Sequence, residues 1–143
     1  MISKISHTCI YVLDQDRAYD FYVNKLGFKV HTDAPMGEGA RWLTVTPPEQ
    51  PELEITLFLI KEGGMFDKDT VESMTTLIKR GTFGSAVFTC KNLLATYEEL
   101  TAKGVVLKSH QRKSFMDLKH FLWMTPVIGF HWLKKVPSYE INI

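Results

Sequence analysis

The sequence lacks most of the features that mark specialised classes of protein. It has two cysteines, Cys9 and Cys90, in 143 residues, with no CxxC spacing between them. Both fall inside predicted strands, where we expect buried, reduced thiols without a catalytic role. No apolar run approaches the length that spans a bilayer, and the N-terminus lacks the charged-then-apolar layout of a signal peptide. We therefore expect a cytoplasmic protein.

A strong excess of charge of either sign is also missing. The formal net charge is +1, and acidic and basic residues are mixed along the chain. Nothing in this pattern predicts binding to nucleic acid or to an anionic membrane. There is no Ser-His-Asp arrangement and no glycine-rich loop of the kind that cradles phosphate. With 45% hydrophobic and 23% charged residues, the composition is that of one globular domain, and we expect a small-molecule partner.

The first half of the chain has the pattern of strands around one helix. Residues 3–13 alternate as a strand does, and Asp14 is a plausible N-cap for the helix that follows. The apolar positions of that helix fall at helical spacing, and Gly27 is placed as its stop. Further strands are predicted at residues 28–33, 40–46 and 53–60, with a turn at 35–39.

The second half of the chain repeats this order. It follows a linker at residues 63–80, whose short helix is predicted to open at Asp69 and Glu72 in the spacing of a capping box. Three signals then come in the same order as before. They are a strand at 82–90, an N-cap at Asn92 and a glycine stop at Gly104.

Aligning the two halves supports a duplication. Placing His7 over Ser85 also places Asp14 over Asn92, so strand, cap and helix coincide. The match predicts a single domain of two βαβββ modules, residues 1–62 and 81–143, joined by the linker helix. The alternative is that any two strand–helix segments look alike at this level of detail.

Particular residues carry a resemblance to a known family. The run His-Thr-Cys-Ile-Tyr-Val at 7–12, the Phe-Tyr pair at 21–22 and Leu-Gly-Phe at 26–28 resemble the opening strand and helix of the vicinal-oxygen-chelate superfamily. That superfamily contains glyoxalases, bleomycin-resistance proteins and extradiol dioxygenases. The resemblance implies an α+β fold in which two βαβββ modules form curled mixed sheets around a cleft. It also implies a homodimer and a divalent metal such as Zn, Fe, Mn, Ni or Mg.

The family's metal ligands come from four strand positions, of which this chain matches two. His7 matches the first, and Glu54 matches the second by its place in Leu-Glu-Ile; Glu54 is also the candidate catalytic base. The third position is Ser85, whose neutral hydroxyl is a poor ligand beside imidazole or carboxylate. The alternative is structural: His7 hydrogen-bonded within a half-polar strand, and Glu54 paired with a group such as Arg41.

The chain departs from the family after about Lys108, so the second module is atypical at its C-terminal end. If the codons of residues 115–132 are read in the frame that starts at the third base of each codon, the genetic code requires a Gly, two consecutive Asp and a Leu among the new residues. The same reading permits Met-Asp-Asp-Ser-Gly-Asn-Trp-Phe-Ser-Leu, which resembles the family's closing strand, Asp-rich turn and last strand. We therefore predict a reading-frame shift between about Lys108 and Phe115. The alternative is a divergent C-terminus, in which His131 and Glu140 become ligand candidates.

Three functions stay open on the sequence. The first is a glyoxalase-like or dioxygenase-like enzyme with a divalent metal on His7 and Glu54. The second is a metal-free binding protein of the bleomycin-resistance kind, whose cleft holds a flat or apolar ligand. The third is an inactive product of a shifted gene. The ligand-binding candidates are Tyr11, Trp42, Phe58, Phe83 and Ser85.

Overall fold

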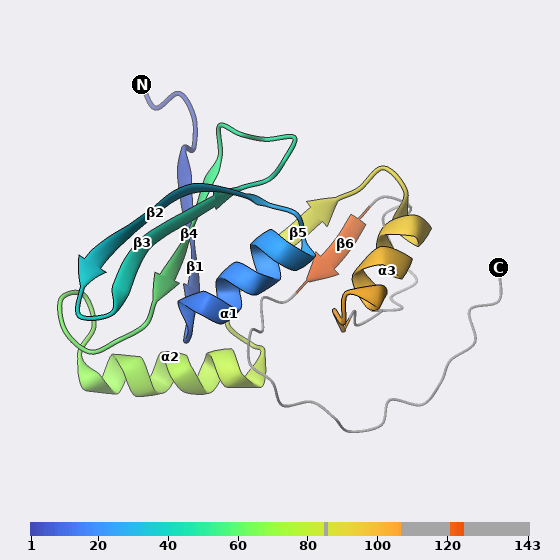
Figure 1. Ribbon diagram of the computed structural model, residues 1–143. Coiled ribbons are helices and arrows are strands. Elements are labelled where there is room, and N and C mark those ends of the chain that lie inside the picture. Colours follow the sequence, from blue (N-terminus) through green and yellow to red (C-terminus); the bar gives the residue numbers. More distant parts are fainter. Residues whose placement is uncertain (85, 107–120, 125–143) are drawn as a thin grey trace.

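The structure is a computed structural model that describes residues 1–84, 86–106 and 121–124. Its first half holds β1 (His7–Val12), α1 (Gln15–Tyr19), the π-helical segment η1 (Asp20–Lys25), β2 (Lys29–Gly37), β3 (Ala40–Thr46) and β4 (Glu54–Leu59). Its second half holds α2 (Lys68–Arg80), β5 (Ala86–Thr89), α3 (Leu93–Ala102) and β6 (Phe121–Met124). Figure 1 shows these elements, with α1 lying across one face of the larger sheet. The fold is α+β, as predicted.

The four strands of the first half form one mixed sheet. Their order is β1-β4-β3-β2, and β1 pairs parallel with β4 while the other neighbours pair antiparallel. Strand β2 extends to Gly37, beyond the end predicted at residue 33. It can do so because Pro35 lies on an edge strand, where a missing N–H need not break the ladder. The turn predicted at residues 35–39 is correspondingly shorter.

The helix of this half begins and ends where the sequence predicts. The Asp14 side chain accepts hydrogen bonds from the backbone N–H groups of Asp16 and Arg17, at 2.9 and 3.0 Å. Gly27 follows the helical segment with a φ of 76°, a left-handed conformation that glycine adopts without steric cost. Cap and stop therefore set the length of the helix that covers the sheet.

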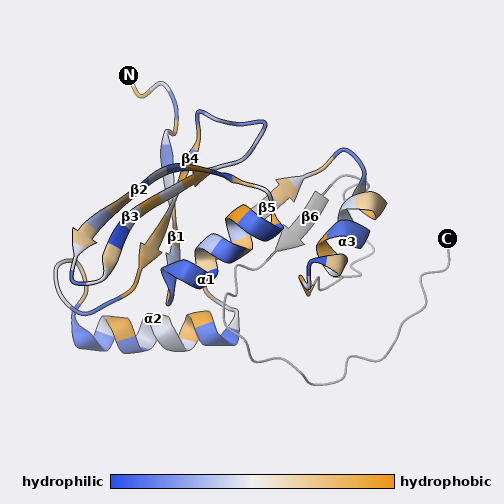
Figure 2. Ribbon diagram, in the orientation of Figure 1, coloured by the Kyte–Doolittle hydropathy of each residue, from blue (hydrophilic) through white to orange (hydrophobic). Residues whose placement is uncertain are grey.

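The core lies between this helix and one face of the sheet. Its members are Val12, Ala18, Tyr22, Phe28, Leu43, Val45, Ile55 and Leu57. Figure 2 shows β4 as largely hydrophobic. Because side chains alternate along a strand, the buried Ile55 and Leu57 fix Glu54, Thr56 and Phe58 on the opposite face. We call this second face, which α1 does not cover, the open face.

The N-cap of α2 lies two residues before the predicted one. This N-cap is Asp67, whose side chain accepts a hydrogen bond from the backbone N–H of Thr70 at 2.8 Å, so the assignment to Asp69 is wrong. A tight turn at residues 63–66, closed by hydrogen bonds between the backbone groups of Gly63 and Phe66, directly precedes the helix. The first side chain after that turn therefore caps the helix.

The second half follows the predicted order of strand, helix and strand. Strands β5 and β6 pair antiparallel, and the Asn92 side chain caps α3 by accepting from the N–H of Ala95 at 3.1 Å. Strand β5 is shorter than the strand predicted at residues 82–90. The remaining strands of a second βαβββ module fall outside the described residues, so the duplication stays a prediction. Within the described residues, no helix is both long and apolar enough to cross a membrane.

Candidate functional site

Glu54 is the centre of a polar cluster on the open face. His7 on β1 and Glu54 on β4 are register partners across the parallel pair, and His7 Nε2 lies 3.2 Å from Glu54 Oε1. The second carboxylate oxygen has two partners. His31 Nδ1 lies 3.0 Å from Oε2, and the Thr44 hydroxyl donates to Oε2 at 2.9 Å. Three strands besides β4 thus contribute to one carboxylate.

The burial of this cluster places the carboxylate beneath the two imidazoles. The Glu54 side chain is 17% exposed, whereas those of His7 and His31 are 46% and 51% exposed. Thr44 below them is fully buried. A molecule on the open face would therefore meet the imidazoles first and the carboxylate between them. The arrangement can accept hydrogen bonds from a ligand and can exchange protons with it.

The structure excludes one expected partner of Glu54 and adds a residue that the pattern did not indicate. Arg41 does not pair with Glu54: its guanidinium contacts Asp16 at 2.8 Å and Asp33 at 3.4 Å. The missed residue is His31. It lies where the register of β2 shifts between Val30 and Thr32, and such an irregularity has no signal in the sequence.

Aromatic side chains gather farther along the open face. Tyr11 and Phe58 are register partners, four residues after His7 and Glu54, and therefore share their face. The Tyr11 ring makes edge contacts at centroid distances of 5.8–6.0 Å with Phe58, Phe66 and Phe83. Phe66 is a member that the sequence analysis missed. Trp42 is 38% exposed, and Ser85 lies outside the described residues.

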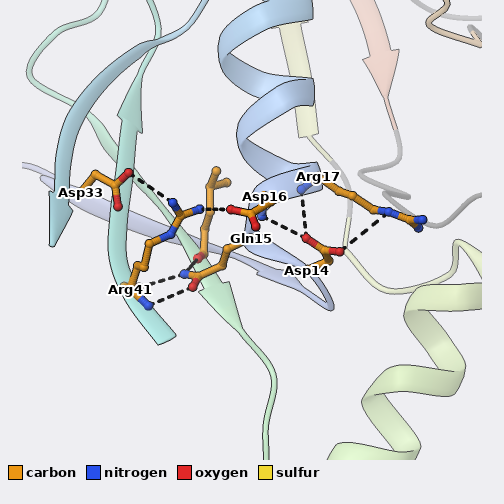
Figure 3. Close-up of polar contacts among 7 residues, drawn as sticks. Asp14, Gln15, Asp16, Arg17, Asp33 and Arg41 are labelled. Carbon is orange, nitrogen blue, oxygen red and sulfur yellow. Dashed lines mark hydrogen bonds and ion pairs between the residues drawn. The ribbon is translucent and has the colours of Figure 1, made fainter. Parts of the chain in front are cut away.

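A third feature connects the helix to the strands that carry these side chains. The Gln15 side chain is buried and inserts between β3 and β4 (Figure 3). Its Nε2 donates to the carbonyl oxygens of Arg41 and Leu57, both at 2.8 Å. The Arg41 N–H donates back to Gln15 Oε1 at 2.9 Å. One amide thus satisfies three backbone groups that would otherwise need a strand partner.

Comparison with known proteins identifies the family. The sequence profile of the Glyoxalase/Bleomycin resistance protein/Dioxygenase superfamily matches residues 4–121. The chain belongs to this superfamily. One relative is the uncharacterized protein YetH of Bacillus subtilis (strain 168). It is 31% identical to this chain over 105 residues, which are 73% of this chain and 76% of YetH.

Two solved structures support the same assignment. The crystal structure of UcmS2 is similar with a TM-score of 0.72 and 36% identity, covering 86% of this chain and 97% of that one. A superfamily member from Sphaerobacter thermophilus DSM 20745 has a TM-score of 0.51 and 27% identity, covering 76% of this chain and 77% of that one. The resemblance inferred from the sequence is thus confirmed.

The described side chains do not by themselves make a complete metal site. His7 and Glu54 lie together at the two matched ligand positions. Within the described parts of the chain, however, no group of three or more His, Cys, Asp or Glu residues is arranged to hold a metal ion. The third family position, Ser85, lies outside the described residues, as do His131, Glu140 and the predicted frame shift. The metal therefore stays a prediction.

Proposed function

We propose that this superfamily member is a metal-free small-molecule binding protein of the bleomycin-resistance kind. The observation that carries the proposal is the aromatic cluster on the open face, where Tyr11 contacts Phe58 and Phe83 edge to face. Aromatic rings supply large apolar contact area for flat ligands. Trp42, more than a third exposed on the same sheet face, adds a further ring for contact.

The polar cluster supports this proposal by giving the ligand an orientation. Each oxygen of Glu54 already has a partner in the protein, so its carboxylate is held in one position. A fixed acceptor at one end of an apolar surface is the usual composition of a small-molecule site. We infer that the ligand presents a hydroxyl or amine to Glu54 and its flat apolar part to the aromatic rings.

A divalent-metal enzyme of the glyoxalase or dioxygenase kind is the second candidate. It is favoured by the 3.2 Å approach of His7 Nε2 to Glu54 Oε1, which are the two matched ligand positions. A bound metal would supply Lewis-acid chemistry. In that case Glu54 would serve as ligand or base.

In both cases we propose that the protein acts in the cytoplasm as a homodimer, which light scattering would reveal as twice the chain mass.

Thermal unfolding with added ligands separates the two candidates, because whatever binds the native state raises its melting temperature. We expect no shift with Zn²⁺, Fe²⁺, Mn²⁺, Ni²⁺ or Mg²⁺, and a concentration-dependent rise with flat aromatic compounds. The rise in melting temperature caused by aromatic compounds should be lost in Phe58→Leu. It should be kept in Tyr97→Leu, which removes an exposed ring from α3. A metal-induced rise that disappears in His7→Ala would instead support the metal-enzyme candidate.

A further inference from the structure

The two central strands separate at the point where the aromatic residues begin. Strands β3 and β4 pair at Thr44 with Thr56 and at Val45 with Ile55. Continuing that register would bring Trp42 opposite Phe58. Within the described strands the pairing does not continue, and the Gln15 amide occupies the backbone groups instead.

Each of the two aromatic residues keeps a partner on its other side. Phe58 stays in register with Tyr11 on β1, and their ring centroids are 5.9 Å apart. Trp42 stays in register with Ala34 on β2. Beyond Thr44 and Thr56 the sheet is therefore two two-stranded ribbons, β1 with β4 and β2 with β3, and Gln15 lies between them from the helix side.

The separation matters because a paired ladder leaves no room for a ring. Side chains directly opposite each other in an antiparallel pair have Cβ atoms about 4.5–5.5 Å apart. A planar ring held between two others needs about 7 Å, twice the carbon contact distance of about 3.5 Å. If β3 and β4 closed on each other, Trp42 and Phe58 would contact each other directly and exclude the ring.

Resting on the proposed function, we propose that Gln15 is a positioning residue that keeps Trp42 and Phe58 far enough apart to hold one planar aromatic ring. The ligand class follows from the closed end of the split. There the Thr44 hydroxyl oxygen lies 2.9 Å from a carboxylate oxygen of Glu54. A hydroxyl or amine on the ring therefore has the Glu54 carboxylate as an acceptor. Gln15 itself contacts backbone and acts only through the strand spacing.

Three small probes separate planarity from polarity. They are 2-naphthol, which is planar with a hydroxyl, naphthalene, which lacks the hydroxyl, and decahydro-2-naphthol, which keeps the hydroxyl on a saturated frame. By calorimetric titration of the full chain, we expect 2-naphthol to bind about tenfold tighter than decahydro-2-naphthol, because ring–ring contacts favour the planar frame. Naphthalene should bind about threefold more weakly than 2-naphthol, because it makes no hydrogen bond to Glu54.

The Gln15→Ala variant tests the positioning role through this preference. With no amide between them, β3 and β4 can pair, and the preference for 2-naphthol over decahydro-2-naphthol should fall to about twofold or less, the lower end of what a ring–ring contact contributes. Asn92→Ala, which removes the cap of α3 in the second half, should keep the full preference. If Gln15→Ala fails to fold, Trp42→Leu in the folded chain must abolish the preference.

The outcomes distinguish this inference from the function on which it rests. The inference alone is overturned if the unaltered chain binds the probes and Gln15→Ala keeps the same preference for 2-naphthol. The same holds for Trp42→Leu where that variant is used. Failure of the unaltered chain to bind any of the three probes overturns both the inference and the proposed function. A preference that falls equally in Asn92→Ala shows a general loss of stability and also overturns the positioning role.

Discussion

Replacing Gln15 by leucine should destabilise the protein more than any surface substitution. Leucine has a similar volume but no amide, so the space between β3 and β4 stays filled while three hydrogen bonds are lost. The groups left unpaired are the N–H and carbonyl of Arg41 and the carbonyl of Leu57. Gln15 is 6% exposed, so water has little access to replace them.

The magnitude follows from the cost of unpaired backbone groups. Each buried donor or acceptor left unsatisfied costs roughly 1–3 kcal/mol, and the two Arg41 groups are only part-buried. The sum is about 3 kcal/mol of the free energy of unfolding. For a domain of this size the loss corresponds to a fall in melting temperature of about 10 °C.

Urea unfolding followed by circular dichroism measures this loss directly. The matched control is Gln50→Leu, the same chemical change at an exposed position, which should alter the free energy of unfolding by less than about 0.5 kcal/mol. A loss below about 1 kcal/mol for Gln15→Leu would show that Arg41 and Leu57 find other partners. The three hydrogen bonds would then not account for the separation of the strands.

Three further predictions concern other parts of the chain. Leu57→Ala, at a fully buried core position, should lower the free energy of unfolding by about 2–5 kcal/mol, while the exposed Leu94→Ala should change it little. Hydrogen bonds from Thr70 lower the pKa of Asp67 below its usual 3.8. The stability that the Asp67 charge contributes is therefore fully present at pH values above the pKa of the unfolded chain. It is lost as the pH falls through the lower pKa of the folded chain. Urea titrations should accordingly find Asp67→Asn less stable than the unaltered chain near neutral pH, with the difference shrinking below about pH 4; a constant difference would contradict this. Sequencing the coding DNA from residue 107 to the stop codon should find Met-Asp-Asp-Ser-Gly-Asn-Trp-Phe-Ser-Leu in another frame, and codons incompatible with it would exclude the shift.

Local signals in the sequence predicted the elements of the first half well. Asp14 and Gly27 are short-range signals, and a cap or a left-handed glycine acts on its own helix. Alternation along residues 53–60 likewise predicts Glu54 and Phe58 on one face, since the period of two is a property of any strand. The cap of α2 was misplaced because both Asp67 and Asp69 suit the position. The tight turn closed between Gly63 and Phe66 ends directly before Asp67 and favours the first.

The polar cluster depended on strand pairing and could be predicted only in part. His7 and Glu54 are far apart in sequence and meet because β1 and β4 pair parallel. The family resemblance implied that the two residues meet, as matched ligand positions, but not how their strands pair. His31 joins them through an irregularity in β2, and Arg41 turns away toward Asp16 and Asp33. Both outcomes depend on the exact register of an edge strand, which a pattern of apolar and polar residues does not determine.

The split between β3 and β4 connects the stability of this fold to its proposed function. A fully paired sheet would satisfy every backbone group with its own strands, yet it would bring Trp42 against Phe58 and leave no space for a ring. Gln15 satisfies the same backbone groups with a side-chain amide, so the strands can separate without unpaired N–H or carbonyl groups. A buried glutamine at the start of α1 is therefore best explained by the open face that it lies behind. The helix that closes the core on one side of the sheet also sets the spacing of the aromatic residues on the other.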